Sequence, residues 1–186
     1  MQMHSPDQVL ASIQARLCSA AANRRDGWRT PAVALVGTDG SPSVRTVVLR
    51  KAQSDRLVFH TDSRSEKWAA LLKKPTVAWC FWDVRTREQL RIVGSCELHE
   101  NDAVSAVDWS RLGPKARAGY QIDPAPGTPI NAAEAFSFDD SHGSDHFAVV
   151  HCKPIAMDWL KLGRPHHQRA RFNFEDGDWF GQWLVP

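Results

Sequence analysis

Cationic and hydroxyl side chains gather between Ser43 and Lys67, where two apolar strand patterns lead into the start of a helix. Arg45 and Arg50 bracket the first apolar stretch, and Thr61, Ser65 and Lys67 follow the second. A planar guanidinium recognises phosphate through two parallel hydrogen bonds. A helix N-terminus adds unpaired backbone N–H groups and a favourable dipole. These residue types in this order predict an anion cradle that suits a phosphate group.

Each of these residues also has an interpretation that needs no ligand. Arg45 is equally well explained as a solvated residue at a sheet edge, and Ser63 or Ser65 as a simple helix cap. Strand alternation adds a constraint, because Arg45 and Arg50 fall on opposite faces of a regular strand over 44–50. One strand therefore cannot aim both guanidinium groups at the same point.

The whole chain has the composition of one ordinary globular domain. Its 186 residues suffice for a sizeable core, with 42% hydrophobic residues, 24% charged residues and a net charge of +2. This weak charge gives no reason to expect nucleic acid as a partner. The four cysteines form no CxxC pair, the N-terminal segment is polar, and no run approaches membrane-spanning length. We therefore expect free thiols, no membrane association and a cytoplasmic location.

Hydrophobic periodicity predicts an α+β fold that is mainly β. A helix is expected over 6–22, with Ser5 as N-cap and Pro6 in its first turn. Short strands at close intervals, with few helices between them, are typical of an antiparallel barrel-like sheet with flanking helices. The expected strands cover 32–36, 44–50, 56–60, 76–82, 89–98, 147–152, 155–160, 169–174 and 179–185, and further helices cover 63–74, 101–112 and 114–120. Residues 121–145 hold three prolines and two glycines and predict a long loop or lid.

Three ordered motifs carry a resemblance to a known family. RTVVLR at 45–50, followed by FxTxxxSxK from Phe59 to Lys67, resembles the FMN-phosphate signature of the pyridoxamine 5′-phosphate oxidase-like FMN-binding split barrels. Gln89 stands in REQLRIVG, which is similar to a family segment with a flavin-contacting glutamine. Trp159, with Arg169 ten residues later, resembles the C-terminal hairpin of the family. The resemblance extends roughly from Arg29 to Pro186.

The resemblance implies an FMN-binding split β-barrel with a Greek-key-like antiparallel sheet, forming one domain over 1–186. It also implies a homodimer with FMN at the interface, and we prefer Arg169 to Arg171 as the ring-facing arginine. The implied cofactor-binding residues are Arg45, Thr46, Val47, Val48, Leu49, Arg50, His60, Thr61, Ser65, Lys67, Gln89, Trp159 and Arg169.

Two positions depart from the family pattern, because Arg50 replaces a usual lysine and Glu66 replaces an arginine. True pyridoxamine-phosphate oxidases hold the substrate phosphate with a Tyr, an Arg and a Ser, and the segment 108–117 does not reproduce that spacing. The candidate substrate-binding residues are Arg50, Arg111, Lys115 and His167. Arg111 and Lys115 fit a solvated helix face equally well, and His167 fits a turn cap.

The expected function is that of an FMN-dependent oxidoreductase acting on an unidentified small molecule. No dedicated catalytic base is assigned, because the redox chemistry belongs to the flavin. The alternatives are a non-catalytic flavin or haem carrier or sensor on the same barrel, and a genuine pyridoxamine or pyridoxine phosphate oxidase.

The histidines in and after the loop 121–145 raise a different possibility, a metal site. His142 and His146 have i, i+4 spacing and His151 follows, but Gly143 argues against the helix that would give the spacing meaning. We expect no metal there.

Overall fold

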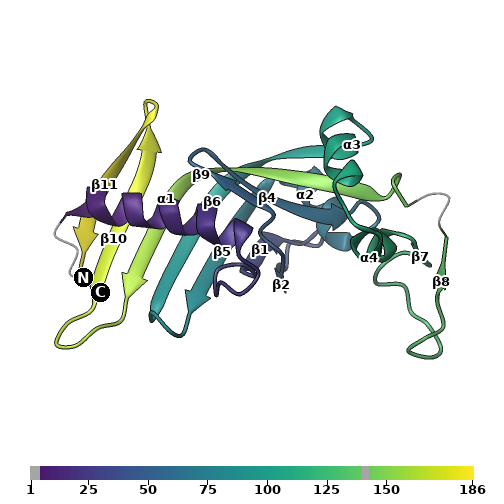
Figure 1. The fold of residues 1–186 in the computed structure, drawn as a ribbon, viewed down its shortest axis with the longest axis horizontal. Coiled ribbons are helices and arrows are strands. Elements are labelled where there is room, and N and C mark those ends of the chain that lie inside the picture. The colour runs from purple at the N-terminus through teal and green to yellow at the C-terminus, as the bar shows by residue number, and fades with distance from the viewer. Residues whose placement is uncertain (1–4, 140–142) are drawn as a thin grey trace.

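The computed structural model describes residues 5–139 and 143–186, and Figure 1 shows a long twisted sheet crossed by the N-terminal helix. That helix, α1 (Pro6–Ala22), matches its predicted bounds. The Ser5 hydroxyl accepts a hydrogen bond from the Gln8 N–H at 3.3 Å. Val9, Ile13 and Leu17 are buried, so the periodic apolar face is the one that packs on the sheet.

Most of the predicted elements appear in the predicted order with adjusted ends, and the structure adds three short strands that the sequence did not predict, over 51–53, 122–123 and 137–138. The strands are β1 (Ala32–Val36), β2 (Pro42–Thr46), β3 (Lys51–Gln53), β4 (Arg56–Asp62), β5 (Thr76–Asp83), β6 (Glu88–Glu100), β7 (Ile122–Asp123), β8 (Ser137–Phe138), β9 (Phe147–Lys161), β10 (Gln168–Glu175) and β11 (Asp178–Leu184). The helices are α2 (Glu66–Lys73), α3 (Ala103–Ser110) and α4 (Pro114–Arg117), with a 3₁₀ turn at Ala118–Tyr120. The main sheet has the order β11-β10-β9-β6-β5-β1-β2, and all of its pairs are antiparallel.

Strand β9 creates the split in the barrel. It pairs with β6 along its length on one edge, whereas its other edge pairs first with β4 and then with β10. The sequence predicted two strands around a turn at Lys153-Pro154, and this is wrong, because β9 continues through Pro154. The register with β6 shifts beside this proline, which has no N–H to donate. Val93 pairs with Ala156 and Gly94 with Pro154, so Ile155 of β9 is the extra residue of a bulge. Gly94 is required there, since a Cβ would lie 2.4 Å from the Cys152 Sγ.

The strand predicted over 44–50 ends earlier, at Thr46. The next residues leave the β1 ladder, and the N–H groups of Val47 and Leu49 donate to the carbonyls of Pro31 and Arg29 at 3.0 and 2.9 Å. The Arg50 N–H then donates to the Val58 carbonyl at 2.8 Å. The segment thus crosses from β1 to β4 while Val47 and Leu49 stay buried, so the predicted alternation of side chains survives.

Four of the eight tryptophans lie in the core. Trp28, Trp68, Trp79 and Trp159 are each at most 3% exposed. The Trp79 ring stacks on Phe81 at 5.8 Å and meets Phe59 edge-on at 5.5 Å. Trp28 contacts α1, with the Arg16 guanidinium 4.0 Å from the centre of its ring.

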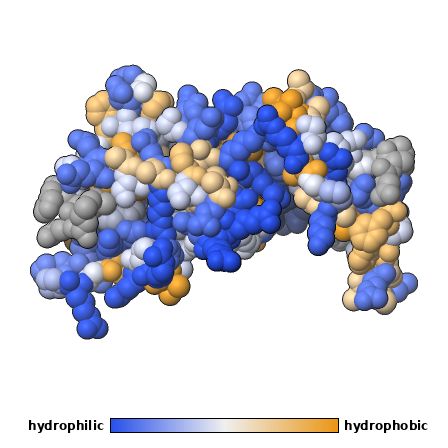
Figure 2. Space-filling model, in the orientation of Figure 1, coloured by the Kyte–Doolittle hydropathy of each residue, from blue (hydrophilic) through white to orange (hydrophobic). Residues whose placement is uncertain are grey.

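The predicted loop 121–145 contains the two-stranded ladder β7–β8 within its described part. Ile130, Phe136 and Phe138 are exposed on this excursion, which Figure 2 shows as an orange area at the right of the molecule. Residues 140–142, with His142, lie outside the described residues.

Candidate functional site

The predicted anion cradle forms where β2, the end of β4 and the start of α2 meet. Ser65 is the N-cap of α2 and Lys67 lies in its first turn. The Lys67 ammonium donates to the Thr61 Oγ1 and lies 3.4 Å from the Ser65 Oγ, and the two hydroxyl oxygens are 3.3 Å apart. The end of β4 and the start of α2, which follow each other in sequence, therefore bring the predicted hydroxyls and ammonium together.

The cradle has an excess of positive charge. Burial, and then the nearby Arg45 guanidinium, lower the pKa of Lys67 from 10.5 to about 8. Asp62 opposes this shift, but its carboxylate is held by Arg64 at 2.8 Å. The Arg45 Nη2 donates to the Ser43 hydroxyl, while its buried Nη1 has no hydrogen-bond partner. Within residues 5–139 and 143–186, neither Arg45 nor Lys67 forms an ion pair with a carboxylate, so the cradle lacks an anion.

Arg50 lies in a different environment from Arg45. Burial lowers the pKa of His60 and raises that of Tyr120; the Arg50 charge adds to the first shift and opposes the second, whereas Arg45 acts on Lys67. The buried Nε of Arg50 has no hydrogen-bond partner in the described structure. Arg45 and Arg50 therefore lie in two different environments, the first beside Lys67 and the second beside His60. Of the other residues in that motif, Thr46 is exposed, Val48 is partly buried, and Val47 and Leu49 pack in the core.

His60 is part of a buried polar cluster beside Arg50. Its Nε2 lies 3.1 Å from the Asp108 Oδ2, and the Lys51 ammonium lies 2.5 Å from the Asp108 Oδ1. Burial lowers the pKa of His60 to about 4, so its imidazole is neutral near pH 7. The His60 Nδ1 is buried without a hydrogen-bond partner. His60 therefore offers one ring nitrogen in this region while Asp108 holds the other.

Gln89 and Arg169 lie in one row across the outer face of the sheet. Gln89 pairs with Trp82 and with Leu160, and Leu160 pairs with Arg169. Residues directly opposite each other in a sheet share a face, so the four side chains project to the same side. Trp82 is 44% exposed in this row.

The structure places the Trp159 side chain on the opposite face of the sheet from Gln89 and Arg169. Trp159 pairs with Leu90 and Ala170, and all three are buried in the core under α1. At 2% exposure its ring has no free face. Trp82 is the tryptophan that shares a face with Gln89 and Arg169.

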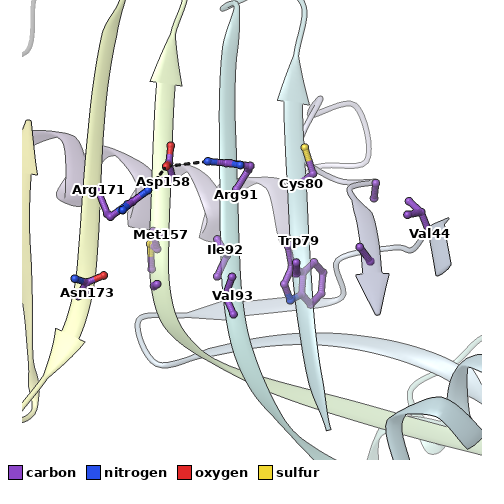
Figure 3. Close-up of a pocket in the computed structure, with 14 residues that line it drawn as sticks. Val44, Trp79, Cys80, Arg91, Ile92, Val93, Met157, Asp158, Arg171 and Asn173 are labelled. Atoms are coloured by element: carbon purple, nitrogen blue, oxygen red, sulfur yellow. Dashed lines mark hydrogen bonds and ion pairs between the residues drawn. The ribbon is translucent and has the colours of Figure 1, made fainter. Parts of the chain in front are cut away.

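One carboxylate organises the arginines next to this row. Figure 3 shows Asp158 between Arg91 and Arg171, with an Asp158 oxygen 2.9 Å from an Arg91 nitrogen and 3.4 Å from an Arg171 nitrogen. Arg169 donates two hydrogen bonds to the same carboxylate, at 3.1 and 2.9 Å. Arg169 and Arg171 therefore share a face, and a single negative charge meets three positive ones.

A shallow hollow of 590 Å³ continues from Asp158 across the same face. Alanines form much of its floor, and Val44 at its edge is 65% exposed. The alanines are Ala32, Ala34, Ala78 and Ala156. The outer face of the sheet is thus flat and apolar beside a cationic row (Figure 3).

The cradle and the row of Gln89 and Arg169 lie far apart in one chain. Thr61 pairs with Ala148 near the start of β9, and Arg169 pairs with Leu160 near its end. At ~3.3 Å per residue, these positions are roughly 35–40 Å apart along the strand. Figure 1 shows β9 running from the end beside α3 to the hairpin of β10 and β11. One flavin mononucleotide does not span that length.

The candidate substrate residues do not converge. Arg111 approaches Asp108 at 3.8 Å with a mostly exposed side chain, and Lys115 is exposed on α4. His167 is exposed in the turn between β9 and β10, where its Nδ1 accepts a hydrogen bond from the Gly163 N–H at 3.1 Å. Arg50 lies in the cluster around His60, and Arg111 reaches Asp108 of that cluster from the surface, whereas Lys115 and His167 form no ion pair with Asp108 in the described structure.

The comparisons with known proteins agree with this geometry. The family model "Pyridoxamine 5′-phosphate oxidase, FMN-binding domain" matches residues 11–100. The chain is 30% identical over 158 residues to the pyridoxine/pyridoxamine 5′-phosphate oxidase of Cupriavidus metallidurans, covering 79% of this chain and 74% of that one. The chain belongs to the pyridoxamine 5′-phosphate oxidase family. An Arabidopsis thaliana pyridoxine/pyridoxamine 5′-phosphate oxidase 2 is 30% identical over 145 residues, or 70% of this chain and 72% of that one.

Solved structures confirm the split-barrel fold of the family. A pyridoxamine 5′-phosphate oxidase-related FMN-binding protein of Nostoc punctiforme superposes with a TM-score of 0.76 at 26% identity, covering 100% of this chain and 99% of that one. PhzG of Burkholderia lata gives a TM-score of 0.78 at 18% identity, with 100% and 98% coverage, and supports the fold alone. No helix in the described part of the chain is long and apolar enough to cross a membrane.

The sequence did not predict two buried carboxylates that hold basic side chains in place. Asp108 holds both His60 and Lys51, and Asp158 holds Arg91, Arg169 and Arg171. Asp158 had an available signal, since strand alternation puts it on the face opposite Trp159. The contact of Asp108 with β4 had none, because it depends on where α3 docks.

Proposed function

We propose that the chain binds FMN between two copies of itself and serves as an oxidoreductase on a small molecule. The single observation that carries this proposal is the unbalanced cradle. Arg45 and Lys67 converge without a carboxylate in the described structure, and the buried Arg45 Nη1 has no hydrogen-bond partner. A phosphate oxygen would satisfy that donor and offset the charge excess.

The residues present fit the phosphate end of FMN. Arg45 offers the unpaired Nη1 of its guanidinium. Thr61 and Ser65 offer hydroxyl groups, and Lys67 offers an ammonium group. The N-cap position of Ser65 places the first turn of α2 beside them. Glu66, which replaces a family arginine, is exposed. Arg64 does not compensate for it directly, since its guanidinium is bound to Asp62.

The ring end is assigned to a second copy of the chain. The separation along β9 prevents one copy from supplying both ends, and the flat apolar outer face offers a surface for a two-fold partner. We assign Gln89 and Arg169 to the polar edge of the ring, with Trp82 in place of Trp159. An amide and a guanidinium can both donate to the ring carbonyls, and positive charge there favours the reduced anion.

Replacing Ala78 with glutamate should convert the dimer to a monomer and abolish FMN retention. Ala78 is exposed on the outer face within the hollow, so the change buries a carboxylate only when two copies associate. Gel filtration with light scattering measures the mass, and absorbance measures the bound flavin. Ala11→Glu, at an exposed position of α1, is the matched control. A dimeric, FMN-loaded Ala78→Glu variant would contradict this interface.

When bound, FMN would supply the redox chemistry, as the acceptor of a hydride or of electrons from the substrate. The residues of the chain bind and orient it. His60 is neutral near pH 7 because its pKa is about 4, so it acts there as a hydrogen-bonding group and not as a cation. Arg50, whose Nε lacks a partner, is the cation we assign to the substrate side.

The purified protein should be yellow and should release FMN on denaturation. A colourless protein that fails to take up added FMN would overturn the proposal. Oxygen-dependent turnover of pyridoxamine and pyridoxine phosphates tests the activity named in the curated relatives. We expect weak or no turnover, because Arg111 and Lys115 are exposed and do not converge with Arg50. Bound FMN that no substrate reduces would favour the carrier alternative.

FMN affinity should fall as the pH rises above about 8. Lys67 has a pKa of about 8 in the free protein, and a bound phosphate dianion stabilises its charged form. Below this pH the ammonium is already present, whereas above it binding requires proton uptake and weakens about tenfold per pH unit. Fluorescence titrations between about pH 7 and pH 9 measure the slope. Riboflavin, which lacks the phosphate, should show no such slope, and Lys67→Arg should flatten the FMN profile. Equal slopes for FMN and riboflavin would contradict this role of Lys67.

A further inference from the structure

A cluster of two histidines and one glutamate lies on β6 and β9, away from the cradle and from the Arg169 row. Glu97 and His99 belong to β6, and His151 lies directly opposite Glu97 on β9. One ligand atom from each residue lies within 4.8 Å of the others. The two imidazole rings meet edge-on, with their centroids 4.5 Å apart. Strand pairing therefore fixes three potential metal ligands on one face of the sheet.

His99 is prepared for ligation by its other ring nitrogen. Its Nδ1 lies 2.8 Å from the Asp102 Oδ2, so the carboxylate favours a proton on Nδ1 and leaves the Nε2 lone pair free. Asp102 is itself fixed as the N-cap of α3 by a reciprocal capping box with Ser105. His99 is 9% exposed, and its buried Nε2 has no hydrogen-bond partner in the described structure. A buried, unpaired acceptor of this kind calls for a ligand.

We propose that this chain binds a divalent transition-metal ion, of the Zn²⁺ type, through Glu97, His99 Nε2 and a ring nitrogen of His151. Two imidazoles and one carboxylate are a ligand set that such ions accept. Small side-chain rotations bring atoms within 4.8 Å to the spacing of bonds of about 2.0–2.2 Å to one ion. Asp102 is a positioning residue, because it acts through His99.

The surroundings of the cluster favour an open site over a closed one. Glu97 and His151 line a hollow of 410 Å³ together with Asp55, Arg56, Ser95 and Lys153. A fourth position facing this hollow would be taken by water. Arg56 and Lys153 oppose a cation, while the Glu97 carboxylate and the nearby Asp102 favour it.

Such a site would connect β6, β9 and α3, and α3 also carries Asp108 of the polar cluster at His60. The ion joins β6 to β9, and Asp102 joins it to the first turn of α3. Asp108, the partner of His60 and Lys51, lies further along α3. Metal binding should therefore raise the thermal unfolding midpoint of the protein.

The test begins with removal of metal from the FMN-loaded protein by chelator and dialysis. Zn²⁺ is then titrated into the protein in a calorimeter. We expect saturable binding of one Zn²⁺ per chain, weakened at least about tenfold by Glu97→Gln and by His99→Ala. Glu97 is exposed, so its variant should fold even if the buried His99 change does not. Asp102→Asn keeps a helix-capping side chain and should still weaken binding about ten- to a hundred-fold. His166→Ala, an exposed histidine elsewhere, is the matched control and should bind as the wild type does.

Co²⁺ provides an independent readout of the ligands. Its visible absorption should show a low-coordinate site with nitrogen ligands, and the band should disappear in Glu97→Gln and on addition of excess Zn²⁺. No saturable binding by the wild type, or binding that both Glu97→Gln and His99→Ala leave unchanged, would overturn the proposal. Neither outcome bears on FMN binding, which depends on other residues.

Discussion

Replacing Arg45 or Lys67 with alanine should weaken FMN binding by roughly ten- to two-hundred-fold. Each substitution removes one charge-assisted hydrogen bond to the phosphate, worth roughly 1.5–3 kcal/mol. The two residues differ in their effect on the stability of the FMN-free protein. Lys67 is partly buried beside Arg45 and its pKa is depressed to about 8. Below about pH 8 the Lys67 ammonium is charged in both the folded and the unfolded protein, and burying this charge lowers the stability of the folded state. Lys67→Ala should therefore leave the free energy of unfolding unchanged or raise it, while FMN affinity falls.

Quenching of flavin fluorescence on titration gives the dissociation constants, and urea denaturation of the FMN-free protein gives the stability. Arg85→Ala serves as the matched control, because this arginine is 81% exposed on the turn between β5 and β6. Riboflavin separates loss of the phosphate contact from general damage, since its affinity should be equal in the wild type and both variants. Wild-type FMN affinity in both Arg45→Ala and Lys67→Ala would show that the phosphate binds elsewhere.

Local signals predicted the elements of the fold well where a single stretch of sequence decides the outcome. Ser5, Pro6 and the apolar spacing of Val9, Ile13 and Leu17 define α1 without help from the rest of the chain. The continuity of β9 through Pro154 was not predictable in this way. It depends on the bulge at Ile155, where the register with Val93 and Gly94 of β6 shifts, and therefore on pairing between segments about sixty residues apart.

The same distinction between local and long-range contacts applies to the candidate site. The Thr61, Ser65 and Lys67 contacts follow from a strand end and a helix cap, which sequence spacing reveals. The orientation of Trp159 follows from the sheet face that α1 covers, and the sequence alone does not show which face that is. The Glu97, His99 and His151 cluster joins two strands by register, so no spacing along the chain could have revealed it.

A heterodimer of Arg45→Ala and Arg169→Ala chains should bind one FMN, whereas each variant homodimer should bind FMN weakly at both sites. If the cradle of one copy and the ring end of the other form each site, the heterodimer has one site with both defects and one site with neither. If a single copy supplied both ends, every site would have one defect and binding would not recover. Two affinity tags allow the heterodimer to be isolated, and its flavin absorbance relative to protein should be about half that of the wild-type dimer.

The matched control is a heterodimer of Arg45→Ala and Lys67→Ala chains, whose defects both lie in the cradle. Each of its sites contains one damaged cradle under either arrangement, so no recovery is expected. Gln89→Ala in place of Arg169→Ala repeats the test with a neutral side chain and guards against a purely electrostatic effect of the Asp158 cluster. Failure of the Arg45→Ala and Arg169→Ala pair to recover FMN, in a heterodimer shown to be intact, would mean that Arg169 does not complete the site of its partner. The roughly 35–40 Å between Thr61 and Arg169 along β9 makes that outcome unexpected.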